Sequence, residues 1–103
     1  METVVVARES AAFLDYVLEK GIVDTNKESV RVTRYIEPDE AWGKRVVSLG
    51  YPSLRVASVA LYVTCVPIDL PENMRHRSLT LDEIKAHAKR PRTFMAKEIS
   101  SKK

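Results

Sequence analysis

The stretch LRVASVALYVTCV, residues 54–66, decides the fold that the sequence predicts. From Ala57 onward every second residue is apolar, ending with Val63 and Cys65, and the positions between them are mixed, small or neutral. A run that is apolar on one face and small or neutral on the other is typical of a strand in the middle of a sheet. We therefore expect one long central strand at 54–66, which Pro67 ends.

Two strands and a helix are expected on the amino-terminal side of this stretch. Residues 3–7 contain three consecutive valines, which is typical of a short buried strand. Residues 29–36 alternate between apolar and polar side chains, which predicts a strand with one face on a core. Between these strands, Ser10 is positioned to cap a helix that runs to about Lys20, and Gly21 supplies its stop.

A second helix is expected directly before the long strand. Pro38 suits the first turn of a helix, and Trp42, Val46 and Leu49 follow at i, i+4 and i+7. Gly50 then terminates the helix. The order strand, helix, strand, helix, strand predicts a small α+β domain on a three-stranded sheet. Because such a sheet has two free edges, further strands can be added by pairing with another chain.

The order of elements up to Gly50 is similar to that of the Alba family, small archaeal chromatin and RNA-binding proteins whose first strand is followed by a helix, a strand and a second helix. The similarity covers half of the chain and concerns the fold. Where that family has a basic pair after the first strand, this chain has Glu9 and Ser10. Where the family has a Gly/Arg-rich turn into the second helix, this chain has Pro38 and two acidic residues. No site residue is carried over from the resemblance.

Charge divides the chain at about residue 73. Residues 74–103 contain nine basic and three acidic residues, a net charge of +6, whereas residues 1–73 carry a net charge of −3. We expect a compact body at 1–73 and a basic helical arm with a tail at 74–103. An acidic body with a basic arm favours a partner of negative charge, which the arm would contact.

The arm contains the best helix signature in the chain. Thr80 and Glu83 form a capping box, and Leu79 and Ile84 occupy the positions of a hydrophobic staple. The helix is expected to run to about Lys89, because a proline follows at position 91. The polar tail after residue 93 is either disordered or docked on a partner surface. Three apolar residues interrupt this tail: Phe94, Met95 and Ile99.

Basic clusters flank this helix on both sides, and a connected basic stripe can neutralise several phosphates. Arginine, which outnumbers lysine here, also suits bidentate phosphate contacts and stacking on bases. On the second strand, Arg31 and Tyr35 share a face that suits base stacking. We therefore expect the protein to bind nucleic acid, either structured RNA or DNA with RNA preferred, as a small non-catalytic subunit of a larger ribonucleoprotein or nucleoprotein complex. The expected contact residues are Arg31, Tyr35, Arg75, Arg77, Lys85, Lys89, Arg90 and Arg92.

A protein partner is the main alternative. The first helix carries Glu9, Asp15 and Glu19, so the acidic body is suited to contact a protein or a second copy of the chain, through its surface or a sheet edge. A protein-interaction or assembly factor, viral or accessory, whose arm lies on an acidic protein would show nearly the same charge pattern. An enzyme is the weakest of the three interpretations.

No motif for catalysis, metal binding or cofactor binding stands out. His76 and His87 lie eleven residues apart, unlike the closely paired ligands of zinc sites. The serines lie in no nucleophile-elbow motif, and the three scattered glycines form no phosphate-cradling loop. Cys65 is expected on a buried face, where a thiol is inert. We expect no catalytic residue, no metal and no small-molecule cofactor.

The composition predicts a cytoplasmic protein. A single cysteine cannot form an internal disulfide, which fits a reducing compartment. The longest uncharged run, 56–68, is too short to span a bilayer and no targeting segment is evident, so no membrane contact is expected. The lack of glutamine and the many charges are typical of thermophilic proteins, although sampling in a short chain gives the same result.

Overall fold

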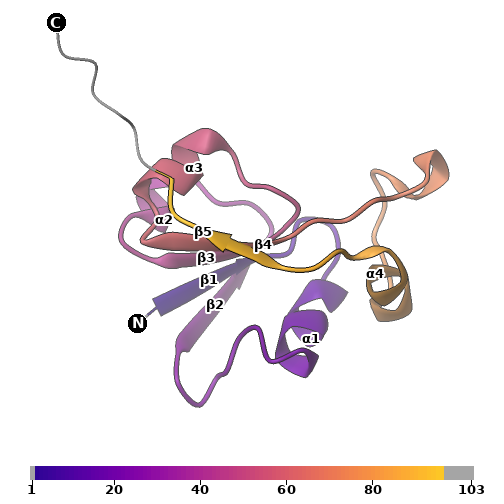
Figure 1. Ribbon diagram of the computed structural model, residues 1–103, viewed down its shortest axis with the longest axis horizontal. Coiled ribbons are helices and arrows are strands. Elements are labelled where there is room, and N and C mark those ends of the chain that lie inside the picture. The colour runs from indigo at the N-terminus through magenta and orange to yellow at the C-terminus, as the bar shows by residue number, and fades with distance from the viewer. Residues whose placement is uncertain (1, 97–103) are drawn as a thin grey trace, which may run out of the picture.

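Five strands pair into one sheet within residues 2–96, the part of the chain that the computed structural model describes (Figure 1). They are β1 (Glu2–Val6), β2 (Ser29–Thr33), β3 (Arg45–Leu49), β4 (Tyr62–Val66) and β5 (Arg92–Phe94). The order in the sheet is β2-β1-β3-β4-β5, with the first four strands parallel and β5 antiparallel to β4. The predicted α+β class is confirmed, but the described residues form five strands instead of the expected three.

Short helices cover both faces of this sheet. α1 (Ala12–Glu19) and α4 (Leu81–His87) lie on one face, and α2 (Pro38–Ala41) and α3 (Leu54–Val59) lie on the other (Figure 1). A 3-10 helix, η1 (Glu72–Met74), lies in the long connection between β4 and α4. This connection and α4 extend beyond the carboxyl ends of the parallel strands. Among the helices of residues 2–96, none is long and apolar enough to cross a membrane.

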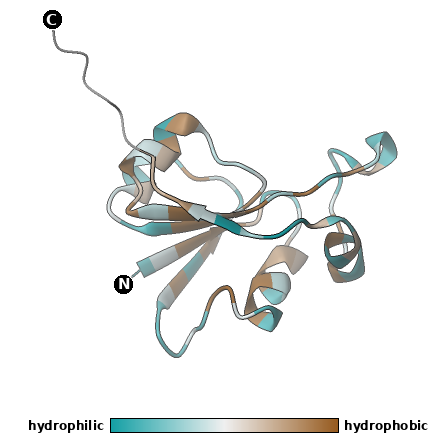
Figure 2. Ribbon diagram, in the orientation of Figure 1, coloured by the Kyte–Doolittle hydropathy of each residue, from teal (hydrophilic) through white to brown (hydrophobic). Residues whose placement is uncertain are grey.

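Alternation along the central strands builds two cores, one on each face. Val5 and Val47 face α1 and α4, in a cluster that includes the fully buried Ile84. Val4 and Val46, the next residues on these strands, face α2 and α3. Burial on both faces is typical of parallel strands joined by crossovers. Figure 2 shows apolar residues along the inner strands, whereas polar positions gather on η1 and on the connection from α4 to β5.

The prediction of one long strand at 54–66 is wrong in its first half. Leu54–Val59 forms α3, and only Tyr62–Val66 forms a strand. The helix begins at a side-chain cap, because the Ser53 hydroxyl accepts a hydrogen bond from the backbone N–H of Val56 at 3.2 Å. A continuous apolar run does not by itself distinguish a buried strand from a buried helix. Here one run contains a short helix followed by a strand.

The predicted second helix, at 38–50, is wrong beyond its first turn. α2 is four residues long, and Arg45–Leu49 is β3, the central strand of the sheet. Gly43 has φ of +69°, a left-handed conformation that interrupts the helix. Trp42 is 70% exposed. Its i, i+4, i+7 spacing to Val46 and Leu49 therefore does not mark the buried face of a helix. The element order that is similar to the Alba family therefore holds through α2, after which a strand follows.

The helix ends that were predicted for α1 are confirmed in part. Gly21 has φ of +71° and stops α1 in a Schellman motif, in which the N–H of Ile22 donates to the carbonyl oxygen of Val17 at 2.9 Å. The prediction that Ser10 caps this helix is wrong. The Ser10 hydroxyl instead accepts a hydrogen bond from the backbone N–H of Leu79 at 3.0 Å, and thereby joins two distant segments.

The signature of α4 is confirmed. The side chains of Thr80 and Glu83 accept hydrogen bonds from each other's backbone N–H groups, which completes the capping box. Leu79 and Ile84, the residues of the staple, are both buried. The helix ends at His87, slightly earlier than expected.

The basic segment packs on the rest of the chain. Ile84 of α4 belongs to the same core cluster as Phe13 of α1, and β5 pairs with β4. Packing therefore crosses residue 73, where the charge changes. Of the apolar tail residues, Phe94 packs against the α2/α3 core and Met95 is 64% exposed, whereas Ile99 lies outside the described residues.

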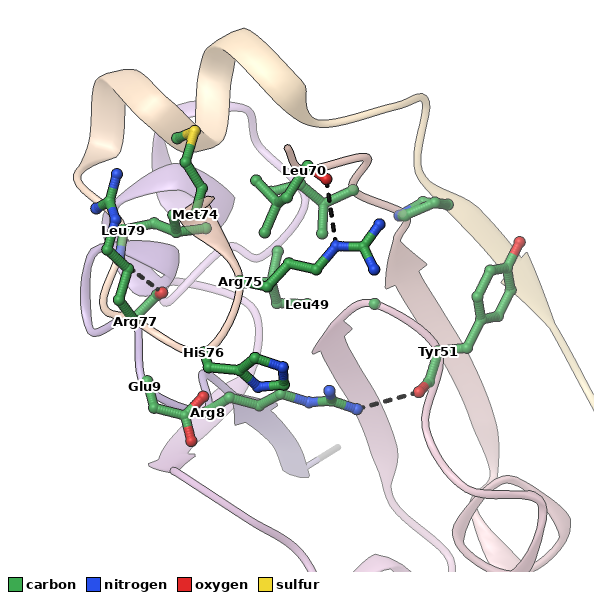
Figure 3. A pocket seen from close by; sticks show the side chains of 14 residues that line it. Arg8, Glu9, Leu49, Tyr51, Leu70, Met74, Arg75, His76, Arg77 and Leu79 are labelled. Carbon is green, nitrogen blue, oxygen red and sulfur yellow. Dashed lines mark hydrogen bonds between the residues drawn. The ribbon is translucent and has the colours of Figure 1, made fainter. Parts of the chain in front are cut away.

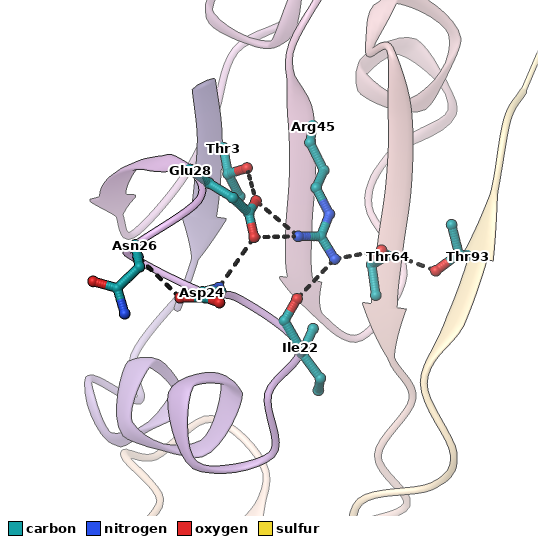
Figure 4. Close-up of polar contacts among 8 residues, drawn as sticks. All are labelled: Thr3, Ile22, Asp24, Asn26, Glu28, Arg45, Thr64 and Thr93. Atoms are coloured by element: carbon teal, nitrogen blue, oxygen red, sulfur yellow. Dashed lines mark hydrogen bonds and ion pairs between the residues drawn. The ribbon is translucent and has the colours of Figure 1, made fainter. Parts of the chain in front are cut away.

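A network of polar contacts lies at the amino ends of the strands, on the face of the sheet that α1 covers (Figure 4). Arg45 forms an ion pair with Glu28 at 2.9 Å and donates to the Ile22 carbonyl oxygen and the Thr64 hydroxyl oxygen at 2.9 and 3.2 Å. Glu28 also accepts a hydrogen bond from the Thr3 hydroxyl. Burial raises the pKa of Glu28, but hydrogen bonds from Thr3, a backbone N–H and Arg45 outweigh burial and lower it. The carboxylate is therefore held in its ionised form.

Candidate functional site

A crevice opens where the strand order changes direction, between β1 and β3. The chain passes from β1 to β2 on one side and then crosses to β3 and β4 on the other. In sheets of this kind ligands bind outside the carboxyl ends of the strands at the switch point. We call this side of the sheet the carboxyl edge and the opposite side the amino edge. The crevice has a volume of about 430 Å³, within the range of ligand sites, and is lined by segments that follow β1, β3, β4 and η1 (Figure 3).

Arg8 follows β1 and has an unusual backbone. Its φ is +53°, a left-handed conformation that costs a non-glycine residue roughly 1–2 kcal/mol. Its backbone N–H donates to the carbonyl oxygen of Arg34 at 3.0 Å, and its guanidinium donates to the backbone oxygen of Tyr51 at 3.2 Å. The side chain therefore reaches from β1 to the loop after β3 (Figure 3). Its remaining N–H groups are available to a ligand.

Arg75 and His76 enter the crevice from the connection after η1. The Nε–H of Arg75 donates to the backbone oxygen of Leu70 at 3.3 Å, and its terminal nitrogens turn toward Tyr51 (Figure 3). His76 has φ of +64°, and its ring lies beside the side chain of Arg8. Within residues 2–96, neither Arg8 nor Arg75 forms an ion pair with a carboxylate.

The chain itself closes one end of the crevice. The hydrogen bond from the Leu79 N–H to the Ser10 hydroxyl is buried and joins the segment after β1 to the start of α4. Leu70 and Met74 pack against the same core cluster at this end. In Figure 3, Met74 and Leu79 lie on the opposite side of the crevice from Tyr51.

Tyr51 connects the crevice to β5. Its side chain is 53% exposed, and it also lines a shallow pocket with Arg92 and Phe94. The preceding residue, Gly50, has φ of +80° and donates its N–H to the Val66 carbonyl oxygen at 2.8 Å, which fixes the turn that presents Tyr51.

Four of the eight predicted contact residues already have partners. Arg77 forms an ion pair with Glu83 at 2.7 Å, and its guanidinium points away from the crevice (Figure 3). The hydrogen bond from Arg77, helped by the Thr80 N–H, lowers the pKa of Glu83 from 4.5 to about 2. The other three pairs are Lys85 with Glu19, Arg31 with Glu40 and Tyr35 with Glu9.

Tyr35 holds a carboxylate at the rim of the crevice. Its hydroxyl donates to Glu9, and this hydrogen bond lowers the pKa of Glu9 and raises that of Tyr35. Tyr35 also lines a second crevice of about 240 Å³ with Arg8, on the α3 side of that residue. Arg31 lies on β2 and lines neither crevice.

The other four predicted residues form no such pairs. Arg75, Lys89, Arg90 and Arg92 are exposed and form no ion pair within the described part of the chain. The backbone N–H of Lys89 donates to the carbonyl oxygen of Pro67, a crevice residue, at 2.7 Å. Residues 89–92 therefore run from the crevice rim to β5.

Sequence reasoning missed Arg8 and Tyr51. Arg8 follows the valine run of β1, and Tyr51 follows Gly50 at the end of β3. Because the carboxyl ends of parallel strands meet at one edge, recognition of β3 as a strand would have placed both residues at one site. The helical pattern predicted for residues 38–50 concealed this signal.

The remaining candidate chemistry is structural. Cys65 is fully buried, and burial raises the pKa of its thiol, which agrees with the predicted inert core cysteine. Within residues 2–96, no three His, Cys, Asp or Glu side chains are grouped so that they could hold a metal ion.

The chain matches no protein-family model, no curated protein and no solved structure. The chemistry of the crevice therefore has to indicate the ligand. Two guanidinium groups, an imidazole, an exposed phenol ring and an apolar end suit an anion that carries an aromatic group.

Proposed function

We propose that this protein binds unpaired nucleotides of structured RNA at the carboxyl edge of its sheet, as a non-catalytic cytoplasmic subunit of a larger nucleoprotein complex. The proposal is carried by one observation: Arg8 and Arg75 converge on an open crevice, and neither has a carboxylate partner in residues 2–96. Guanidinium groups with free donors bind phosphate oxygens in bidentate geometry.

The surface beyond the crevice supports a strand as ligand. Tyr51 stands between the crevice cations and Arg92, and Phe94 lines the next pocket. Cations that alternate with accessible rings match the phosphates and bases of an unpaired strand. The exposed side chains of Lys89 and Arg90 add positive charge beside this path.

Unpaired RNA suits this surface better than a duplex. A duplex presents its phosphates but keeps its bases stacked on each other, so the exposed ring of Tyr51 would have no base to contact. Loops and bulges of a structured RNA present both phosphates and unstacked bases.

The amino edge supports membership of a complex. Trp42 and Leu61 precede β3 and β4 and are 70% and 44% exposed. Their segments are joined by a hydrogen bond from the Gly43 N–H to the Val59 carbonyl oxygen at 3.1 Å. Exposed large apolar side chains on adjoining segments are typical of a protein contact surface. A protein-interaction factor that uses this edge alone is the second candidate function.

Fluorescence anisotropy with a labelled RNA hairpin, measured over a range of salt concentrations, tests the proposal. Phosphates at Arg8, Arg75 and Arg92 predict a log–log salt slope of about −2, because each contact contributes about −0.7 on an unpaired strand. Replacing Arg8 and Arg75 together by alanine should weaken binding by about tenfold or more. Lys27→Ala, which removes an exposed charge near the amino edge, should leave binding unchanged.

Two outcomes contradict the proposal: no binding at about 50 mM salt, where phosphate contacts are strong, or binding that the double variant does not change. The first outcome favours the second candidate, whereas the second outcome places the RNA contact outside the crevice. That candidate predicts that a protein partner co-purifies after nuclease treatment, and that Trp42→Ala abolishes its recovery.

A further inference from the structure

We infer that the crevice receives the phosphorylated end of a nucleic-acid strand, with the terminal phosphate between Arg8 and Arg75 and the terminal base on Tyr51. The inference rests on the proposed function and names the part of the strand that enters the crevice. Three observations carry it: a buried hydrogen bond within the chain closes one end of the crevice, two arginines with free donors line it, and strained backbone is concentrated in it.

The closed end favours the end of a strand over a strand that passes through. A strand that enters beside Tyr51 meets the hydrogen bond between Leu79 and Ser10, with Leu70 and Met74 packed at the same end. An internal phosphate has a nucleotide on each side. A terminal phosphate continues into the strand on one side only, which suits a crevice that the Leu79–Ser10 hydrogen bond closes at one end.

The charge of the crevice matches a phosphomonoester. A terminal phosphate carries a charge of about −1.5 to −2 at neutral pH and three free oxygens, whereas an internal phosphodiester carries one negative charge. Arg8 donates one N–H to the Tyr51 backbone oxygen, and Arg75 donates its Nε–H to Leu70. Both therefore keep terminal N–H groups for the ligand. Glu9, the one carboxylate among the lining residues, is held by the Tyr35 hydroxyl.

Backbone strain is concentrated at the same place. Arg8 and His76 are the two non-glycine residues with positive φ in the described part of the chain, and both line the crevice. Strained conformations persist where the surrounding structure holds them, and they cluster at ligand sites. The two strained residues present a guanidinium and an imidazole to one space, as a phosphate site requires.

Three RNA strands of one sequence, each about ten nucleotides long and labelled internally, test the inference. One carries a 5′-phosphate, one a 3′-phosphate, and one has hydroxyl groups at both ends. Anisotropy titrations should show that one phosphorylated strand binds about tenfold more tightly than the hydroxyl strand, or better. The two phosphorylated strands identify which end enters.

Point variants connect this preference to the crevice. Arg75→Ala and Arg8→Gly should reduce the affinity for the phosphorylated strand to that for the hydroxyl strand, and Arg8→Gly does so without adding backbone strain. Tyr51→Ala should weaken binding and Tyr51→Phe should retain it, because the ring and not the hydroxyl stacks. Lys27→Ala should retain the preference. Circular dichroism melts verify that each variant is folded.

The outcomes separate this inference from the proposed function. Equal affinity for all three strands overturns the strand-end assignment and leaves RNA binding in place. Failure of every strand to bind at low salt removes both. If a nucleoside monophosphate or inorganic phosphate competes as well as the phosphorylated strand does, the crevice is a small-molecule site and the strand-end assignment is wrong.

Discussion

Arginine side chains lie at both the amino and the carboxyl edge of the sheet, but their N–H groups have different partners at the two edges. At the amino edge, Arg45 donates to Glu28 and to two further oxygens, and its side chain is 11% exposed. At the carboxyl edge, Arg8 and Arg75 each make one hydrogen bond to a backbone oxygen and line an open crevice. An arginine most of whose donors bind to the fold is structural, as in Arg45, where within residues 2–96 only the buried Nε–H is left without a partner. An arginine with free donors on an open surface is available to a ligand.

Backbone geometry separates the edges in the same way. Arg45 lies in regular strand pairing with Thr3 of β1 and Tyr62 of β4. Arg8 and His76 lie in the left-handed region. The amino edge therefore stabilises the fold. At the carboxyl edge the strained backbone lowers the stability, as is typical of ligand sites. Substitutions at the two edges should differ in the sign of their effect on stability.

The largest effect is expected at the amino edge. Arg45→Ala removes an ion pair and leaves Glu28, whose side chain is 15% exposed, without its cation. We expect a loss of about 3 kcal/mol in the free energy of unfolding, as is typical when one partner of a mostly buried pair is removed. The matched change at the carboxyl edge, Arg75→Ala, should alter stability by no more than about 0.5 kcal/mol. Urea denaturation followed by circular dichroism measures both.

A double variant tests whether the pair itself is responsible. Replacing Arg45 by Met and Glu28 by Leu removes both charges, so it should recover part of the stability that Arg45→Ala loses. Equal stability losses for Arg45→Ala and Arg75→Ala would contradict the distinction between the two edges.

A smaller effect of opposite sign is expected at Arg8. Arg8→Gly relieves roughly 1–2 kcal/mol of backbone strain and costs about 0.5–1 kcal/mol in chain entropy, so stability should stay the same or rise by up to about 1.5 kcal/mol. Arg8→Ala keeps the strain and should not be stabilised. Both variants should lose RNA affinity, because both lose the guanidinium. Thermal melts and anisotropy titrations separate the two properties; a large loss of stability in Arg8→Gly would show that the side chain is structural.

The sequence identified those elements whose signals are local. The stop at Gly21 and the capping box of Thr80 and Glu83 depend on residues close in the chain, and the structure confirms both. The stretches at 38–50 and 54–66 failed for a common reason: each contains a short helix followed by a central strand. Apolar residues continue through both elements, and some of them, such as Trp42 and Leu54, are exposed. Periodicity therefore marks no boundary between helix and strand.

Most of the contact residues were predicted from the clustering of basic residues in the sequence. Charge alone was not sufficient to distinguish the cations that are available to a ligand. Charge pointed to Arg75 and Arg92, which line pockets on either side of Tyr51. It also pointed to Arg77 and Lys85, which form ion pairs with carboxylates of the same chain. The partner of Lys85 lies on α1, so only the tertiary fold shows that this cation is already neutralised. Arg8 was missed because its role depends on parallel neighbours that the sequence did not reveal.

The smallest effect concerns Glu83, on the arm that charge singled out. Its pKa is lowered to about 2, so the ionised form stabilises the folded state. That contribution is complete above the usual pKa of 4.5 and is lost as the pH falls toward about 2. Urea denaturation at several pH values measures this contribution. As the pH falls over this range, Glu83→Gln should lose less stability than the wild-type protein. Glu28 at the amino edge still titrates in this variant, so the loss of stability in acid should become smaller without disappearing.

Arg77→Ala should reproduce the effect, because Arg77 is the main cause of the lowered pKa of Glu83. An unchanged pH profile in both variants would show that this exposed pair contributes nothing to the stability of the fold.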